Sequence, residues 1–128
     1  MPNIIWVMIG GAIGASFRYI VIRNVSLLIK HVFPWPTITV NLTGSFLIGI
    51  LSAWFLQHEL WLEANQPWKL FLLTGVLGSY TTFSTFSNEV HLLIRERFYK
   101  SALANVLIQN IAGLLLVAVG YFITSALL

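Results

Sequence analysis

Residues 74–89 read TGVLGSYTTFSTFSNE, and this stretch determines what kind of helix can form in its part of the chain. Seven of the nine residues from Ser79 to Ser87 carry a hydroxyl group. Gly75 and Gly78 precede them, and both glycine and β-branched threonine lower the helix propensity. The stretch therefore predicts a helix that breaks near its middle.

The sequence around this stretch is typical of a membrane protein. Hydrophobic residues make up 58% of the 128 residues and charged residues 9%, whereas soluble domains carry about 25% charged residues. Seven basic and four acidic side chains cannot cover a globule of this size in water. The chain has no cysteine, which excludes disulfides and thiolate metal sites. We predict an all-α membrane protein.

The apolar stretches have room for four spans, since one spanning helix needs about 20 mainly apolar residues. We expect one four-helix transmembrane domain, residues 1–128, with both termini on one side. Pro34 and Pro36 place the first loop at residues 30–36, and Pro67 suits the start of the third helix. The four helices are expected at about residues 4–28, 37–57, 67–94 and 101–126.

A break in the third span has a functional meaning in a membrane. Unwound backbone is tolerated there only where protein or a water-filled cavity satisfies its polar groups, so the break predicts an ion or water site. The alternative is that the hydroxyl groups bond back to their own helix and act as small packing residues. Seven hydroxyl groups beside two glycines favour the ion site.

The second and fourth spans add neutral amides. Asn41 lies in the second span, and Asn105 and Gln109 are aligned at helical spacing in the fourth, while Asn110 points elsewhere. A single intramembrane amide can equally be a link between helices. Together these side chains form a set of uncharged hydrogen-bond donors.

Charge indicates which ion suits these donors. Cation pathways and proton relays usually show Asp or Glu inside the bilayer, but the candidate here is Glu89 near the end of the third span, and Arg18 adds a positive charge. Neutral donors with a cation suit an anion. Phe83 and Phe86 share one helix face, and the positive edge of an aromatic ring can contact a small anion. Core packing is the alternative role for these rings.

Three motifs together resemble the small bacterial Fluc (CrcB) fluoride channels: GGAIGASFRY at residues 10–19, TVNLTG at 39–44 and TGVLGSYTTFSTFSNE at 74–89. The resemblance covers essentially the whole chain in length, span count and motif order. The hydroxyl-rich run with its two phenylalanines and the glutamate that follows is highly specific. The glycine-rich motif alone is weak.

The resemblance implies an antiparallel dual-topology dimer with two pores, which passively exports fluoride across the bacterial inner membrane and confers fluoride resistance. It implies a box of ring edges at Phe83 and Phe86, and a hydrogen bond from Asn41 to the ion. The further pathway positions that it implies are Ser84, Thr85, Asn105 and Gln109, with Arg18 and Glu89 at the vestibule and pore mouth. It also implies a central structural sodium ion, bound by the backbone carbonyl groups of Gly78 and Thr81 from both subunits at a break spanning residues 78–81.

Lysine and arginine are distributed unevenly about the spans. The five expected opposite the termini are Arg23, Lys30, Arg95, Arg97 and Lys100. Lys69 alone lies on the terminal side, so the bias predicts one orientation, with the termini outside. An antiparallel homodimer needs the same chain inserted both ways. A paralogous partner of opposite orientation therefore stands as the alternative to the homodimer.

Other classes of protein fit less well. A four-helix drug and proton antiporter would need a carboxylate in the first helix, where this chain has Arg18. A structural membrane protein would not need a polar break. An enzyme is not expected, because His31, His58 and His91 lie in different segments and no nucleophile stands beside a base. Without a basic run, nucleic acid is not an expected partner.

Overall fold

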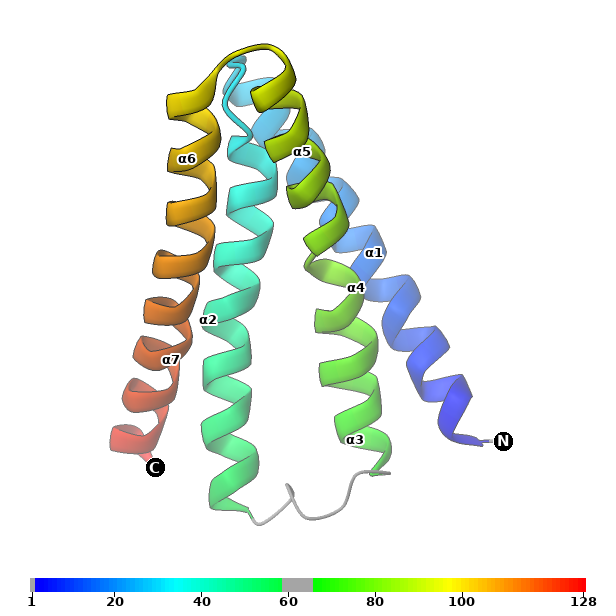
Figure 1. Cartoon of the computed structure of the whole chain (residues 1–128). Coiled ribbons are helices and arrows are strands. Elements are labelled where there is room, and N and C mark those ends of the chain that lie inside the picture. The colour runs from blue at the N-terminus through cyan, green and yellow to red at the C-terminus, as the bar shows by residue number, and fades with distance from the viewer. Residues whose placement is uncertain (1, 59–65) are drawn as a thin grey trace.

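The computed structural model describes residues 2–58 and 66–128, and every regular element within these ranges is a helix. The first two spans are α1 (Pro2–Leu28) and α2 (Trp35–Gln57). The third consists of α3 (Pro67–Lys69), the π-helix η2 (Leu70–Leu77), α4 (Gly78–Tyr80) and α5 (Phe83–Arg95). The fourth consists of α6 (Tyr99–Leu107), the π-helix η3 (Ile108–Ala112) and α7 (Gly113–Leu127). Both termini lie at the same end (Figure 1).

The helices have the length and polarity of membrane spans. Within the described residues, Asn3–Leu28, Trp35–Gln57 and Tyr99–Leu127 are each long and apolar enough to cross a bilayer. The third span is divided by its break, and its longest continuous α-helix, α5, has 13 residues. Large apolar side chains cover the outside, as at Leu114 (74% exposed) and Phe122 (67% exposed). The all-α membrane fold expected from the sequence is confirmed.

The first loop is shorter than expected. We expected it to include Pro36, but α2 already begins at Trp35. Pro36 lies in the first helical turn, where a missing N–H group leaves no hydrogen bond unmade. The preceding loop packs inward through Phe33, which is buried and stacks edge-on against Trp35 with ring centroids 4.9 Å apart.

Glycines allow α1 to lie directly against the third span. A β-carbon at Gly10 would collide with the carbonyl oxygen of Phe71, and one at Gly14 with the carbonyl oxygen of Val76. Small residues at such contacts let two helix backbones approach closely, which is a main source of helix association in membranes. This contact anchors the N-terminal half of the broken span.

Gly14→Ala tests this contact, and Gly11→Ala is its matched control. The added methyl group at Gly14 meets a backbone oxygen that cannot move aside, whereas a β-carbon at Gly11 meets no atom within 4 Å. We expect Gly14→Ala to lower the melting temperature of the purified protein in detergent by several degrees, and Gly11→Ala to leave it near the parent value. Equal melting temperatures for the two variants would contradict the close contact.

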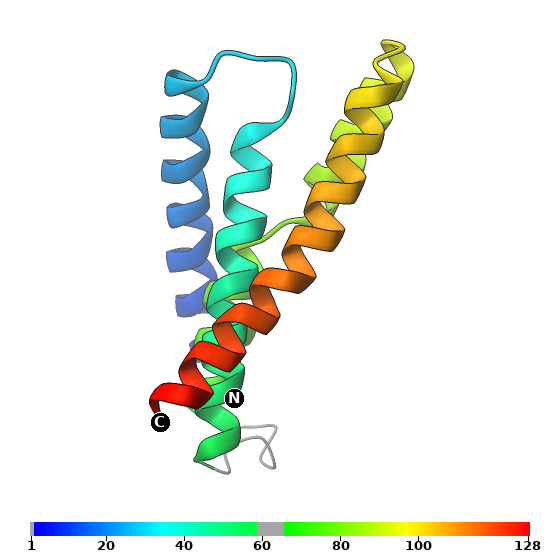
Figure 2. The same ribbon diagram turned by 90° about the vertical axis from the view of Figure 1, so that its left-hand side faces the viewer.

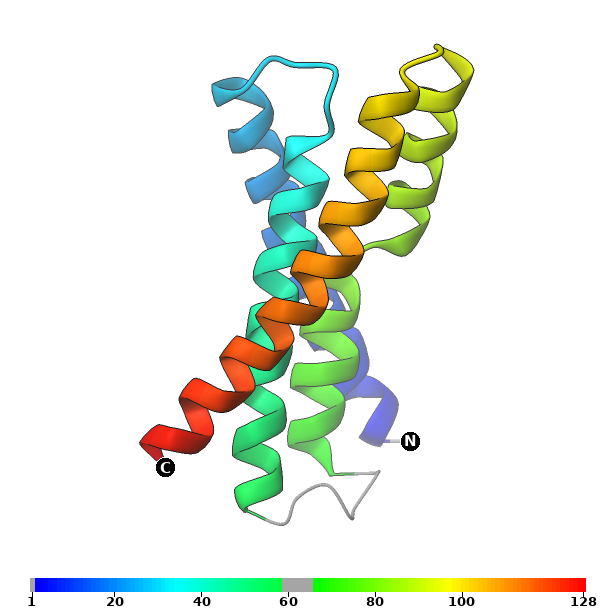
Figure 3. The same ribbon diagram turned by 60° about the vertical axis from the view of Figure 1, so that its left-hand side comes forward.

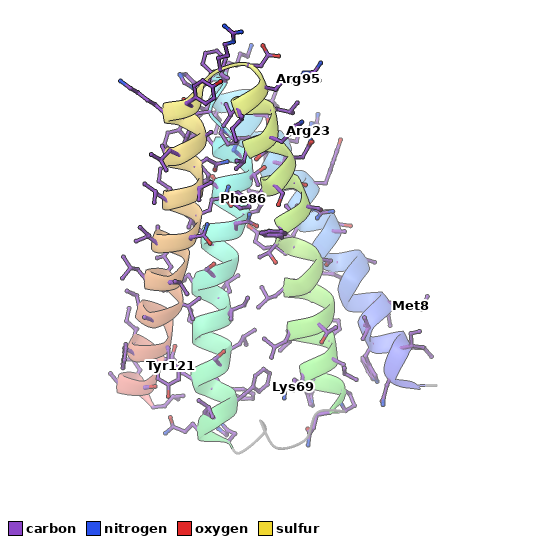
Figure 4. The ribbon with its side chains drawn as sticks, in the orientation of Figure 1. Met8, Arg23, Lys69, Phe86, Arg95 and Tyr121 are labelled. Carbon is purple, nitrogen blue, oxygen red and sulfur yellow. The ribbon has the colours of Figure 1, made fainter. Side chains whose placement is uncertain are left out.

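The C-terminal half of the third span belongs to a separate helical hairpin. α5 packs against α6, and the turn between them contains Arg97 with a positive φ of 65°. Figure 2 shows this hairpin leaning away from α1 toward the end opposite the termini. Arg23 and Arg95 lie at that end, and Lys69 lies at the end of the termini (Figure 4). These are the sides on which the sequence analysis placed them.

Candidate ion site at the helix break

The break consists of two extended residues, Thr81 (φ −85°, ψ 159°) and Thr82 (φ −149°, ψ 116°). They form the non-helical link between α4 and α5 (Figure 3). We expected the break at residues 78–81, but Gly78 keeps helical dihedral angles (φ −62°, ψ −35°). The extended backbone falls instead on the paired threonines, because β-branched residues favour that conformation.

Asn41 of α2 replaces the hydrogen bonds that the broken helix loses. Its Oδ1 accepts from the backbone N–H of Thr82 at 2.8 Å, and its Nδ2 donates to the carbonyl oxygen of Thr82 at 3.0 Å. The second N–H of Asn41 donates to Oε1 of Gln109 at 2.6 Å. An unpaired peptide group costs several kcal/mol in hydrocarbon, so this amide stabilises the break. Asn41, expected to donate to the ion, has both N–H groups engaged in this conformation.

Threonine hydroxyl groups begin the helix that follows the break. The Thr82 side-chain oxygen accepts from the backbone N–H of Thr85 at 3.2 Å, which is the usual N-cap bond. The Thr82 hydroxyl also donates to Oγ1 of Thr85 at 3.0 Å and lies 3.4 Å from Oγ of Ser84. The hydroxyl groups of Ser84 and Thr85, expected near the pathway, therefore belong to this cap.

A cavity of about 240 Å³ lies against the break. It is lined by four of the expected pathway residues, from three different spans: Asn41, Phe83, Phe86 and Gln109. Thr81 and Thr82 complete its wall at the break. Within the described residues, no ionised side chain lines this cavity. The structure therefore brings uncharged donors and two aromatic rings to one place.

The two phenylalanines differ in exposure. Their ring centroids are 5.8 Å apart, with the planes tilted by 54°. Phe83 is 77% exposed, whereas Phe86 is half-buried and lies between α5 and α2 (Figure 4). A ring with so much free surface is not filling the core of this chain, so packing within the chain does not explain Phe83.

Six of the expected residues lie outside this cavity, including Ser84 and Thr85 of the helix cap. Arg18 on α1 and Gly78 on α4 do not line it. Glu89 accepts a hydrogen bond from the Thr37 hydroxyl at 2.6 Å and faces a second cavity, of about 420 Å³, at the end of α5. Asn105 is completely buried and reaches the cavity only through Gln109, whose Nε2 donates to its Oδ1 at 2.8 Å.

Two further polar residues line the cavity that were not among the expected pathway positions, Ser45 and Asn110. Helical spacing predicted that Asn110 points away from Gln109; Asn110 borders the cavity, but it is exposed and its Nδ2 donates to the carbonyl oxygen of Val106 at 2.8 Å. Gln109 and Asn110 lie in the π-helix η3. In a π-helix, hydrogen bonds run from residue i to i+5, and neighbouring side chains diverge less than in an α-helix. No signal in the sequence marks this π-helical turn. Ser45 stands one turn after Asn41, and helical spacing aligns the two in the sequence.

The donor set also limits how a metal ion could bind. The described residues contain no group of three or more His, Cys, Asp or Glu side chains that could hold one. Because the N–H groups of Thr81, Thr82 and Thr85 bond to Leu77, to Asn41 and to the Thr82 hydroxyl, the carbonyl groups of Gly78 and Thr81 accept no hydrogen bond from described residues. A cation at the break would therefore depend on backbone oxygen atoms.

Together these features define a class, the small polytopic membrane protein whose spans line an uncharged polar cavity at a helix break. Within this class, the family described as CrcB-like protein, Camphor Resistance (CrcB) matches residues 5–121, and the chain belongs to this family.

Curated relatives match over most of their length. The fluoride-specific ion channel FluC of Salinibacter ruber is 40% identical over 124 residues, which cover 94% of this chain and 87% of the relative. The FluC of Elusimicrobium minutum is 44% identical over 116 residues, which cover 88% of this chain and 82% of the relative. The FluC of Rhizobium meliloti is 39% identical over 127 residues, covering 99% of each chain.

Proposed function

We propose that this protein is a passive channel for fluoride. The observation that carries the proposal is the cavity at the break, where Asn41, Gln109 and the rings of Phe83 and Phe86 meet without an ionised side chain. The relatives named as fluoride-specific channels support the choice of ion.

Fluoride is small and strongly hydrated, so a pathway must replace its water with other donors. Amide N–H groups, hydroxyl groups and ring edges serve this purpose, and because each holds the ion weakly, the ion can leave again. Along the pathway we place Asn41, Phe83, Phe86, Ser84, Thr85, Asn105 and Gln109. Arg18 and Glu89 would lie at its ends.

The functional unit that we propose is an antiparallel dimer with two pores. Phe83 is 77% exposed beside the polar break, and a ring at this position needs a second chain to complete a pathway. The carbonyl groups of Gly78 and Thr81, which accept no bond from described residues, fit a structural sodium ion shared by two subunits. Such an ion would supply positive potential near the pathway.

Passive conduction is sufficient for export. Hydrogen fluoride that enters a bacterial cell from an acidic medium ionises inside, and a negative-inside potential drives the anion out through an open channel in the inner membrane. The expected consequence is fluoride resistance.

Anion efflux from liposomes tests the proposal. Purified protein reconstituted into vesicles loaded with fluoride should release it rapidly when a potassium ionophore sets the potential, as measured with a fluoride electrode. Vesicles loaded with chloride should release their anion at least about 100-fold more slowly, because chloride is larger and the site is built for a small ion. Equal rates for the two anions, or no fluoride release, would reject the proposed function.

Single-cysteine labelling tests the antiparallel dimer. Glu96→Cys places a thiol at an exposed position on the hairpin turn of a chain without native cysteine. In intact cells that express this chain alone, we expect about half of the thiols to react with an impermeant reagent and the rest only after permeabilisation. Labelling from one face alone would contradict the homodimer and favour a paralogous partner, as the basic-residue bias predicts.

A further inference from the structure

Asn105 presents an unusual buried donor. Its side chain has no exposed surface, and its Nδ2 has no hydrogen-bond partner within the described residues. Buried amides in proteins are almost always hydrogen-bonded, and an exception needs an explanation. Both N–H groups of Asn105 thus lack a partner among the described residues, and an ion that meets them must pass Gln109, because Asn105 itself does not line the cavity at the break.

The orientation of this amide follows from the main chain at the break. A backbone peptide has a fixed donor and a fixed acceptor, so the Thr82 N–H requires the oxygen of Asn41, bonded at 2.8 Å, to face it. The Asn41 nitrogen must then donate to Oε1 of Gln109 at 2.6 Å. The other end of the Gln109 amide is the donor Nε2, which bonds to Oδ1 of Asn105 at 2.8 Å. The nitrogen of Asn105 is left free at the end of this chain of amides.

We propose that Gln109 is a positioning residue, which holds the buried Asn105 amide so that both of its N–H groups face a small anion. The inference rests on the proposed function, since the anion is the conducted fluoride. If Gln109 did not donate to Oδ1, the Asn105 amide could rotate and present its oxygen to the pathway, where it would repel an anion. The direction of three amides therefore makes one of them a dedicated donor.

Two replacements of Gln109 separate positioning from packing. Gln109→Met keeps the length and volume of the side chain but removes both of its amide bonds. Gln109→His restores an acceptor and a donor on one ring, since neutral histidine accepts at one nitrogen and donates at the other. We expect Gln109→Met to slow fluoride efflux at least about fivefold and Gln109→His to stay within about twofold of the parent at pH 8.

The histidine variant also supplies a pH profile that a structural role would not produce. Protonated histidine has two donors and no acceptor, so it cannot accept from Asn41, and the chain of amides is interrupted at its first link. We expect fluoride efflux through Gln109→His, relative to the parent channel in matched vesicles, to fall toward that of Gln109→Met as the pH is lowered from about 8 to about 5.5. Protein-free vesicles at each pH correct for leakage of hydrogen fluoride.

A double-mutant cycle with Asn105→Leu completes the test. Leucine has the same branching and the same number of side-chain heavy atoms as asparagine and removes the unpartnered amide, so this variant should fold but conduct slowly. If Gln109 acts through Asn105, Gln109→Met should have no further effect in the Asn105→Leu background. Additive losses, parental efflux in Gln109→Met, or a Gln109→His variant that follows the parent at every pH would each overturn the inference. A parent channel without fluoride efflux would instead reject the proposed function.

Discussion

Fluoride efflux should fall more than about 100-fold when Asn41 is replaced by leucine, and the protein should also become less stable. Leucine has the same branching and the same number of side-chain heavy atoms as asparagine but leaves the N–H and the carbonyl group of Thr82 without the partners that they have at 2.8 and 3.0 Å. Each unsatisfied buried group costs about 1–3 kcal/mol, so the break itself should rearrange. The measurements are the initial rate of efflux and the melting temperature in detergent.

Thr39→Val is the matched control for this variant. Thr39 lies on the same helix, and among the described residues its hydroxyl bonds to the carbonyl oxygen of Trp35, within one turn. Its replacement by the isosteric valine should leave both the efflux and the melting temperature close to those of the parent. An Asn41→Leu protein that conducts like this control would show that the two hydrogen bonds between Asn41 and the peptide groups of Thr82 are dispensable.

Asn41→Asp tests the effect of a negative charge at this position while one of the two hydrogen bonds to Thr82 is kept. A carboxylate still accepts from the N–H of Thr82 but cannot donate to its carbonyl oxygen, and it places a negative charge beside an anion pathway. Repulsion between like charges at low dielectric costs several kcal/mol, so conduction should be abolished while the carboxylate is ionised. Parental conduction by this variant at neutral pH would mean that the pathway runs elsewhere.

The second large effect should come from the rings. Phe83→Ile and Phe86→Ile keep an apolar side chain but remove the ring edge that can contact an anion. We expect each variant to lower fluoride efflux at least about tenfold. Expression and elution volume should persist, above all for Phe83, whose 77% exposure shows that the fold of this chain does not depend on it.

Phe122→Ile provides the comparison for these variants. Phe122 is also exposed (67%), but it lies on α7, away from the cavity at the break. Its replacement should leave the efflux unchanged. If Phe83→Ile and Phe86→Ile conducted as well as this control, the rings would serve only for packing.

Local physical chemistry was enough to predict much of the architecture. The apolar stretches predicted membrane-spanning helices, because their length and polarity depend on neighbours in the chain alone. The hydroxyl-rich run predicted a broken third span, since threonine and glycine weaken a helix wherever it stands. The break was expected at residues 78–81 and lies at residues 81–82, because the choice between glycine and paired threonine depends on what can satisfy the freed peptide groups.

The candidate site could be predicted as a set of residues but not as an arrangement. The motifs named Asn41, Phe83, Phe86 and Gln109, and the structure brings all four to one cavity. The motifs did not predict that both N–H groups of Asn41 are already engaged. Those bonds join residues 41 and 68 positions apart in the chain, and no local pattern determines which atoms such residues present to each other.

The sequence by itself determined the spans, the presence of a break and the lack of carboxylates in the first, second and fourth spans, all of which follow from composition and from neighbouring residues. Only the tertiary structure decided that Asn41 pairs with the peptide of Thr82, that Gln109 reaches both Asn41 and Asn105, and that the Asn105 amide is left with a free nitrogen. The physical reason is that hydrogen bonds are directional. The orientation of an amide is set by the partner that packing brings within reach, and that partner comes from another helix.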